Sequence, residues 1–320
     1  MTKSKSETEE IKFKEESVEY LKFFPHDELL KLWSEIEVEA GVLYVVGTPI
    51  GNIGDISIRA LRVLQKVDIV LAEDTRTSGL LLNHFGIKPS YLSFHQHNFA
   101  SRTEQAIELL KSGKSLAQIS DAGMPAISDP GSELVDRCLD EGIVVKVIPG
   151  PSASTAILSL SGFDTSDFRF IGFLPQKANL KEDILEDLKT YSGISIFYEA
   201  PHRLLKTLED LFDAGFGSRR IALGRELTKH YEEVIRDNLE NLLQYFKENS
   251  PRGEFVFVLD KPSIDEIKRE AEVEKLNLEA TIKTAFEVGK TSKTIQLELQ
   301  DQSGISKNEL KKLIQKLKPE

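Results

Sequence analysis

The sequence predicts an α/β protein in which two consecutive α/β domains are followed by a small helical module. Short apolar runs alternate with amphipathic helical patterns between residues 42 and 260, and this alternation is typical of a mainly parallel sheet with helices on its faces. After residue 263 the sequence becomes polar and helical. We therefore expect the α/β domains over residues 41–163 and 164–262, and the helical module over residues 263–320.

The composition is that of an ordinary globular protein, with 40% hydrophobic and 29% charged residues among 320. The single cysteine, Cys138, excludes an intramolecular disulfide and a cysteine-rich zinc site, and it fits a cytoplasmic protein. No apolar run approaches the ~20 residues of a membrane span, and the N-terminus lacks the apolar core of a signal peptide. The net charge of −11 argues against nucleic-acid binding by the whole surface, although a local basic patch remains compatible with it.

Residues 1–40 form an acidic leader that lies before the first strand pattern. We expect residues 1–16 to be disordered because they are charged and carry little apolar surface. The apolar residues between 17 and 39 permit one or two amphipathic helices, broken at Pro25. A docking helix or a solvated extension is the expected role of this leader.

The first α/β domain begins with a buried-strand pattern over residues 43–46, followed by the glycine-rich loop GTPIGNIGD. This loop is neither a dinucleotide-binding nor a Walker loop, since its glycines are spaced differently and it has no lysine. Asp55 or Ser57 can cap the next helix, and Ser101 with Glu104 has the spacing of a capping box. Further strands are expected at 67–72, 116–119 and 143–148, and helices at 58–66, 103–111, 133–141 and after 154.

The loop over residues 120–131, SDAGMPAISDPG, is the stretch around which this domain is organised. Strand-to-helix loops are where ligands bind in α/β folds. Gly123 and Gly131 can adopt a positive φ, Ala122 leaves room for a ligand near the backbone, and Asp121 can accept hydrogen bonds from a ribose or an amine. A tight turn without a ligand would have the same composition, so composition alone leaves both interpretations open.

The second α/β domain starts near residue 168, after a boundary expected within residues 162–167. Strand patterns cover residues 168–173, 194–198, 220–223, 231–236 and 254–259, and a helix pattern covers 239–247. The last two strand patterns, at 231–236 and 254–259, look like paired strands with the helix between them.

The C-terminal tail has the outline of a helix-turn-helix, with helices over 292–302 and 307–317 around the turn at 303–305. Ser306 and Glu309 form a capping box for the second helix. That helix is basic and could contact phosphate through Lys307, Lys311, Lys312 and Lys316. A small packing module with a solvated lysine face is the alternative that the residues leave open.

The loops of the two α/β domains contain nine motifs, which occur in this order: GTPIGN, AEDTR, FHQHN, SDAGMPAISDP, PGPSA, FIGFLP, FYEAPHR, RELTK and RGEF. In this order and spacing they resemble the motifs of the tetrapyrrole methylase superfamily of S-adenosylmethionine-dependent methyltransferases. The similarity is closest to its branch of 16S rRNA cytidine 2′-O-methyltransferases, and it covers about residues 42–260. The helical tail also fits this branch, whereas the acidic leader is not part of its pattern.

The resemblance implies two α/β domains with the methyl donor, S-adenosylmethionine, in the cleft between them. It also implies a homodimer that acts on 16S rRNA or on the 30S subunit, with no membrane and no metal involved. The cofactor-binding residues that it implies are Pro49, Ser120, Asp121, Ala122, Gly123, Ser152, Ala153, Tyr198, Glu199, Ala200, Leu227, Thr228 and Gly253.

A ribose hydroxyl is a poor nucleophile, so a general base would assist its methylation. Polar residues that follow the predicted strands are the candidates: Glu73, Asp74, His95, His97, Glu199 and Lys229. His95 and His97 lie on one face of an extended segment. Their spacing would suit a metal, but the reaction needs none and no third ligand is evident. We therefore interpret them as structural or RNA-contacting.

RNA contacts are expected from residues that can reach phosphate or a nucleotide. They are Arg76, His95, His97, Asn98 and Arg203, together with the four tail lysines. Arg76 and Arg203 could equally be ion-pair partners of nearby acidic residues.

Three functions compete at this point. The first is an RNA ribose methyltransferase, and the second is a methyltransferase of the same fold acting on a tetrapyrrole or a protein side chain. The third is a non-catalytic ribosome-binding module that keeps the pocket for structure. The motifs and the basic tail favour RNA. The sequence leaves open which residue is the base, whether the substrate is free rRNA or the 30S subunit, and whether the tail binds RNA.

Overall fold

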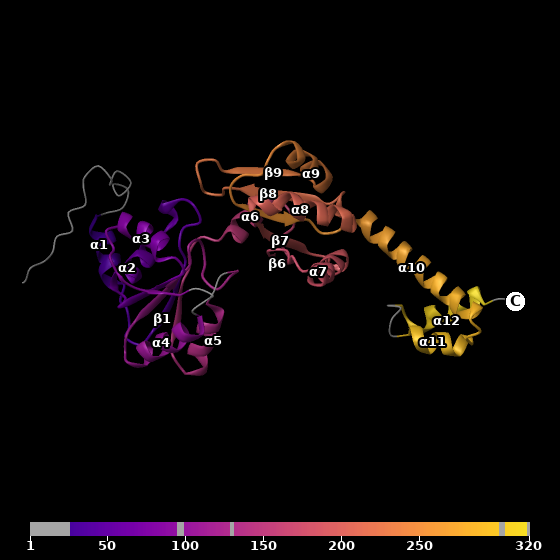
Figure 1. Ribbon diagram of the computed structural model, residues 1–320, viewed down its shortest axis with the longest axis horizontal. Helices are drawn as coiled ribbons and strands as arrows, with labels where there is room; N and C mark the ends of the chain where they lie inside the picture. The colour runs from indigo at the N-terminus through magenta and orange to yellow at the C-terminus, as the bar shows by residue number, and fades with distance from the viewer. Residues whose placement is uncertain (1–25, 95–98, 129–130, 301–304, 319–320) are drawn as a thin grey trace, which may run out of the picture.

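The computed structural model describes residues 26–94, 99–128, 131–300 and 305–318. Figure 1 shows two α/β bodies side by side, with a helical module held away from the second body by a long helix. The predicted disorder of residues 1–16 lies outside the described residues. Within the leader, α1 (His26–Glu35) begins directly after Pro25, where the sequence predicted a helix break. It packs on α2 (Ile58–Lys66), with the Arg62 guanidinium 5.1 Å from the Trp33 ring centroid.

The first body is built on a five-stranded parallel sheet of order β3-β2-β4-β1-β5. Its strands are β1 (Leu43–Val46), β2 (Ile69–Ala72), β3 (Ser90–Ser93), β4 (Leu116–Ile119) and β5 (Val145–Ile148). The helical elements are η3 (Ile53–Asp55), α2, α3 (Thr75–His84), α4 (Phe99–Lys111), α5 (Ser132–Asp140) and α6 (Ala153–Ser161). Tyr44 packs in the core under α2 and α3, whereas its neighbour Leu43 packs in the core under α4 and α5. Burial on both faces explains the unbroken apolar runs of β1 and β2.

The second body has a mixed sheet of order β6-β7-β10-β8-β9, in which only β6 and β7 run parallel. Its strands are β6 (Phe168–Gly172), β7 (Ile194–Glu199), β8 (Arg220–Arg225), β9 (Glu233–Asn238) and β10 (Phe255–Leu259). One face is covered by α7 (Ala178–Thr190), α8 (Pro201–Leu211), η5 (Phe212–Phe216) and α9 (Leu239–Glu248). The other face packs against α6 through Ile157 and Leu158. Helix α6 therefore joins the two bodies.

Several elements differ from the sequence prediction. Strands β9 and β10 do not pair with each other; both pair with β8, on its opposite edges, because α9 crosses over between them. Ser101 does not cap α4, since that helix already begins at Phe99. Four further elements were not predicted: β3, α3, α7 and α8. Two of these helices carry an N-terminal signal, since Asp74 caps α3 and Pro201 opens α8.

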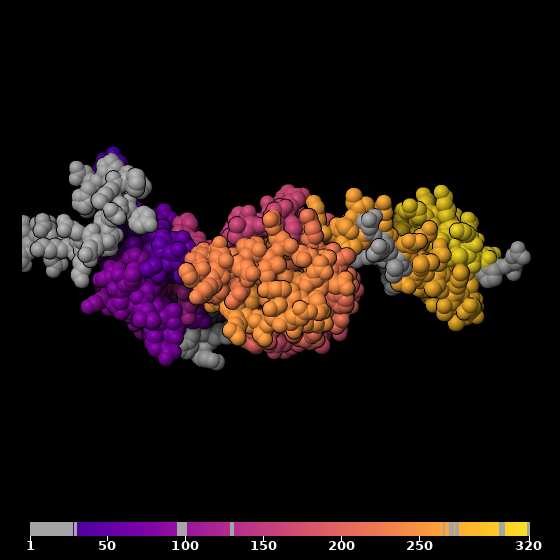
Figure 2. Space-filling model, turned by 90° about the horizontal axis from the view of Figure 1, so that it is seen from above, coloured from indigo at the N-terminus to yellow at the C-terminus, as the bar shows by residue number. Residues whose placement is uncertain are grey.

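The C-terminal module consists of α10 (Ile264–Glu287), α11 (Ser292–Leu299) and α12 (Lys307–Leu317). It has its own small core of Ile282, Ile295, Leu310 and Ile314. The predicted capping box of Ser306 and Glu309 is formed. In Figure 2 the module lies at the far end of the molecule, beyond the second body.

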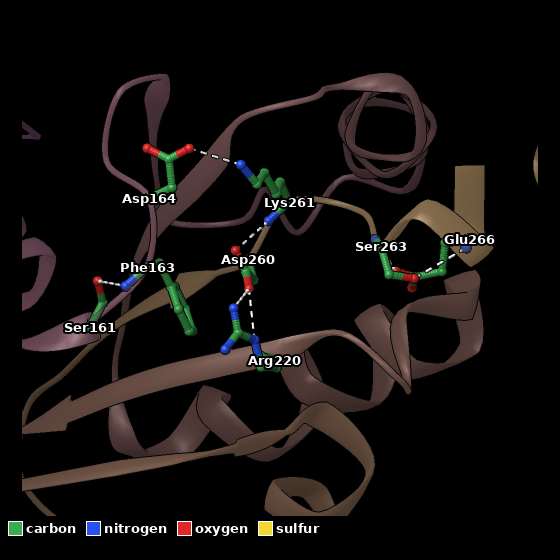
Figure 3. A network of polar contacts seen from close by, with 8 residues as sticks. All are labelled: Ser161, Phe163, Asp164, Arg220, Asp260, Lys261, Ser263 and Glu266. Carbon is green, nitrogen blue, oxygen red and sulfur yellow. Dashed lines mark hydrogen bonds and ion pairs between the residues drawn. The ribbon is translucent and has the colours of Figure 1, made fainter. Parts of the chain in front are cut away.

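A polar network ties the start of α10 to the second body (Figure 3). The Arg220 guanidinium donates to Asp260 at 2.9 and 2.6 Å, and the Lys261 amine donates to Asp164 at 2.9 Å. The helix itself opens with a capping box of Ser263 and Glu266. Within α10, Glu266 also accepts from the Ser218 hydroxyl of the second body at 3.1 Å. No helix in the described part of the chain is long and apolar enough to cross a membrane.

Candidate functional site

A cavity of about 550 Å³ lies between the two bodies, at the carboxyl ends of the central strands of the first sheet. Nine of the predicted cofactor-binding residues line it: Asp121, Ala122, Gly123, Ser152, Ala153, Tyr198, Glu199, Ala200 and Leu227. This volume falls in the usual range for small-molecule sites, roughly 300–1,000 Å³. The loops that the sequence singled out therefore meet around one hollow.

The wall on the first body is held by a backbone bridge between two loops. The Thr48 amide donates to the Gly123 carbonyl at 2.9 Å, and the Gly123 amide donates back to the Thr48 carbonyl at 3.1 Å. The buried Thr48 hydroxyl also donates to the Ser120 carbonyl at 3.1 Å. Gly123 has a φ of +82°, and a Cβ there would lie 3.3 Å from Ile50. The loop therefore needs a glycine at this position.

The loop after β5 reaches the same place through a close contact of two glycines. A Cβ on Gly47 would lie 2.7 Å from the Gly150 backbone, and a Cβ on Gly150 would lie 2.7 Å from Gly47. Strand β1 lies between β4 and β5, so this contact places Ser152 and Ala153 beside Ala122 at the cavity.

The wall on the second body centres on Glu199, the last residue of β7. This carboxylate is 2% exposed, and both of its oxygens are engaged. One accepts from the Ala200 amide at 2.9 Å and pairs with Arg203 Nε at 3.2 Å, and the other accepts from the Thr207 hydroxyl at 2.5 Å. Glu199 therefore holds the start of α8 against the sheet.

A strained turn over residues 226–229 connects the two walls. Glu226 and Thr228 have φ values of 51° and 66°, in the left-handed region that non-glycine residues rarely adopt. The Thr228 hydroxyl accepts from the Asn52 amide at 3.0 Å, and a Cβ on Gly51 would lie 2.5 Å from the Lys229 side chain. The glycine-rich loop of the first body thus lies directly on the second body.

The comparisons with known proteins bear on this architecture. The family model of tetrapyrrole (corrin/porphyrin) methylases matches residues 42–243. A "Ribosomal RNA small subunit methyltransferase I" of Thermotoga maritima is 46% identical over 219 residues, which is 68% of this chain and 98% of that protein. The protein of the same name from Synechocystis sp. is 45% identical over 232 residues, 71% of this chain and 83% of its own.

This chain belongs to the tetrapyrrole methylase family.

Solved structures agree on the fold. The methylase matches the crystal structure of diphthine synthase with a TM-score of 0.57 at 17% identity, covering 71% of this chain and 93% of that one. It matches a cobalt precorrin-4 methyltransferase with a TM-score of 0.54 at 18% identity, covering 69% and 95%. At such identities the likeness shows the fold alone.

The candidate bases of the methylase differ in their surroundings. The Arg76 side chain, at 2.9 Å, and the Arg76 amide hydrogen-bond to Asp74 and lower the pKa of this carboxyl to about 2. Desolvation, by contrast, raises the pKa of Asp121, a cavity-lining carboxyl that accepts from the Asp74 amide at 3.3 Å. Because its pKa is low, the Asp74 carboxylate stays ionised down to low pH and is a weak base. Its structural role is to cap the N-terminus of α3.

Lys229 is held as a cation. Partial burial favours the neutral amine, but hydrogen bonds to Glu254 at 2.9 Å and to Glu226 at 3.0 Å outweigh it and raise the pKa. A lysine whose pKa is raised does not accept a proton at neutral pH. These contacts favour a supporting role for Lys229 in the turn rather than a role as the base.

The other predicted site residues that the structure describes do not line the cavity. Thr228 and Gly253 support the turn over residues 226–229. Arg203 forms an ion pair with Glu199, and Arg76 forms one with Asp74. This is the geometry expected if the two arginines pair with nearby acidic residues. Also outside the lining are Pro49, Ser120, Glu73 and the exposed lysines of α12, Lys307, Lys311, Lys312 and Lys316.

His95, His97 and Asn98 lie outside the described residues. Among the residues that are described, no group of three or more histidine, cysteine, aspartate and glutamate side chains is arranged to hold a metal ion.

Sequence reasoning missed several lining residues. Most stand within motifs that it had singled out: Ile50, Met124, Ile127, Ser128, Phe173, Pro201, His202, Glu254 and Phe255. The motifs indicated these segments, but the sequence does not show which side chains in a motif point into the cavity. Gly224 and Val256 lie outside the motifs and carried no signal.

The Asp74–Arg76 pair predicts a defined titration. With Arg76→Ala, the pKa of Asp74 should rise from about 2 towards the ordinary 3.8, because the main hydrogen-bond donor is removed. A lowered carboxyl pKa stabilises the fold above about pH 4, and this contribution is lost as the pH falls towards 2. Carbon-detected NMR of the Asp74 carboxyl in both proteins measures the pKa directly. An Asp74 pKa that stays near 2 in the variant would exclude Arg76 as the cause.

Proposed function

We propose that this methylase transfers a methyl group from S-adenosylmethionine to the 2′-hydroxyl of a cytidine ribose in the 16S rRNA of the small ribosomal subunit. The observation that carries the proposal is the 46% identity to a ribosomal RNA small subunit methyltransferase I over 98% of that protein's length. The meeting of the motif loops at one cavity supports it from the geometry. We further propose that the methylase works in the cytoplasm, where ribosomal subunits are assembled.

The lining of the cavity fits this donor. Small residues, Ala122, Gly123, Ala153 and Ala200, leave the backbone open to a ligand on both walls. Among the described residues that line the cavity there is no lysine or arginine, whereas carboxylates and aromatic rings are present. Such a lining suits a sulfonium cation with ribose hydroxyls and an amine, and it offers no cradle for a phosphate. When bound, the donor would supply an electrophilic methyl carbon.

The residues of the chain contribute mainly by placing the reactants. The Thr48–Gly123 bridge and the Glu199 hydrogen bonds fix the two walls, so that the donor and the ribose would meet in one orientation. Correct placement of two reactants can account for a large part of a rate enhancement. Of the carboxyls at the cavity, Asp121 combines an open position with a raised pKa, and both properties favour proton acceptance.

The RNA contacts would extend beyond the cavity to the C-terminal module. The four lysines of α12 are all exposed, on a chain whose net charge is −11. Each phosphate contact releases counterions, so a lysine-rich helix contributes affinity that depends on salt. Because α10 holds the module away from the second body (Figure 1), these lysines would contact RNA at a distance from the reacting ribose.

The methylase should transfer labelled methyl groups to 16S rRNA in vitro. The assay mixes the purified protein with methyl-labelled S-adenosylmethionine and either free 16S rRNA or 30S subunits. It measures the label that is incorporated into the RNA. A methylated ribose blocks alkaline cleavage at its 3′ side, which separates it from base methylation. Label in a base, in protein or in neither substrate would contradict the proposal.

Ala122→Trp should abolish donor binding, because the indole would fill the cavity beside Gly123. Calorimetry with S-adenosylmethionine measures the effect, and the wild type should bind one donor per chain. Ala40→Trp, at an exposed position of the leader, is the matched control and should bind as the wild type does. Equal affinity in Ala122→Trp would show that the donor binds elsewhere.

Replacing the four α12 lysines by glutamine should weaken RNA binding and flatten its salt dependence, while donor affinity stays the same. Glutamine keeps helix propensity, so the module should remain folded. RNA affinity at several salt concentrations is the measurement, and four exposed lysines elsewhere are the control: Lys88, Lys177, Lys247 and Lys268. An unchanged salt slope in the α12 variant would mean that the module only packs.

We also propose that the methylase is a homodimer, as the family resemblance implies. Two-fold dimers are the commonest assembly of soluble proteins. Light scattering at micromolar concentration should give about twice the chain mass of 36.0 kDa. A mass of one chain would contradict this proposal and would leave the assignment of the cavity unaffected.

A further inference from the structure

We propose that Phe173 is the platform on which the base of the target nucleotide stacks while its ribose is methylated. The inference rests on the proposed function, since it concerns an RNA substrate. It assigns a role to the FIGFLP motif, from which neither the family resemblance nor the candidate base list drew a residue.

A bulge in the edge strand β6 turns Phe173 towards the cavity. Phe170 pairs with Ile196, but the next pair joins Gly172 to Phe197, so Ile171 is an extra residue. A shift of one residue moves all the following side chains to the other face of a sheet. Ile171 packs in the helix-covered core, whereas Phe173 lies beside Tyr198 on the cavity face. Bulges of this kind often re-aim a side chain next to an active site.

The ring of Phe173 is held in place although it is exposed. It is 46% exposed, and it meets the Tyr198 ring edge-on, with the centroids 6.0 Å apart. The Arg203 guanidinium lies 6.0 Å from the ring centroid and donates to the adjacent Leu174 carbonyl at 2.5 Å. Arg203 is itself paired with the buried Glu199. A ring that is held by its neighbours and is still largely exposed is suited to stacking, because little freedom is lost on binding.

A second exposed apolar side chain, Ile127, lines the same cavity. Ile127 is 45% exposed and stands between Ala126 and Ser128, whose φ values of 67° and 62° are strained for these residues. Ser128 lies over β6, since a Cβ on Gly172 would come within 3.0 Å of its hydroxyl. The strained loop therefore brings Ile127 to the cavity from the first body while Phe173 reaches it from the second.

An aromatic ring and an aliphatic side chain that line the same cavity fit a flat uncharged group better than a phosphate. Bases that are drawn out of a stack for chemistry are held in this way between apolar and aromatic side chains. Phe173 and Ile127 are about half exposed, whereas Leu227 and Val256 of the same cavity are 6% and 4% exposed. The two exposed side chains thus lie at the mouth of the cavity, where the acceptor must enter to reach a donor bound deeper.

The test compares Phe173→Ala with the matched control Phe168→Ala. Phe168 is the first residue of β6, the strand that ends one residue before Phe173; it is 50% exposed, but it does not line the cavity. Phe173→Ala should lower kcat/KM for 16S rRNA by about 5- to 150-fold, the equivalent of one stacked base. Donor affinity and melting temperature should stay as in the wild type, as should all properties of Phe168→Ala. Phe173→Tyr, which keeps the ring, should restore activity.

A substrate without the target base completes the test. In a ligated 16S rRNA whose target nucleotide is abasic, Phe173→Ala and wild type should be equally active, because the ring then has no partner. The same penalty on both substrates, or a loss of donor affinity in Phe173→Ala, would overturn the assignment. Methylation of intact 16S rRNA by the wild type, measured in the same series, reports separately on the proposed function.

Discussion

The contact between Gly47 and Gly150 is the constraint on which the site depends. A Cβ on either residue would lie 2.7 Å from the backbone of the other, so only glycine permits this approach. It joins the loops that follow β1 and β5, and the Thr48–Gly123 bridge adds the loop that follows β4. Three loops far apart in the sequence therefore form one wall, which follows from the neighbouring positions of their strands in the sheet.

The second wall depends on a different kind of support. Its residues follow strands of a mixed sheet, and they are held by charged and hydroxyl groups, chiefly the buried Glu199 with Arg203 and Thr207. Helix α6 leaves the first sheet and packs on the second, and Asn52 hydrogen-bonds to Thr228 across the gap. The cavity is thus shared by two bodies that contact each other directly. A donor bound in such a site would be contacted from two sides. This arrangement suits an enzyme that accelerates its reaction mainly by positioning the two reactants.

The sequence predicted the central strands and the cavity loops because both have local causes. Strands β1 and β4 are buried on both faces and read as mainly apolar runs, and residues such as Gly123 are required by backbone geometry. The pairing of β9 and β10 was mispredicted, because the order of strands in a sheet depends on tertiary packing. The position of Phe173 could not be predicted either, since it depends on a one-residue bulge in β6 that has no periodic signal.

The most direct test of the account is to map 2′-O-methylated riboses on 16S rRNA from cells that lack this protein. The account predicts that one methylated cytidine ribose is missing and that the wild-type gene restores it. A gene encoding Ala122→Trp should leave it missing, although the protein is made and folded. An unchanged methylation map, or full restoration by Ala122→Trp, would contradict the claim that the cavity between the two bodies carries out this reaction.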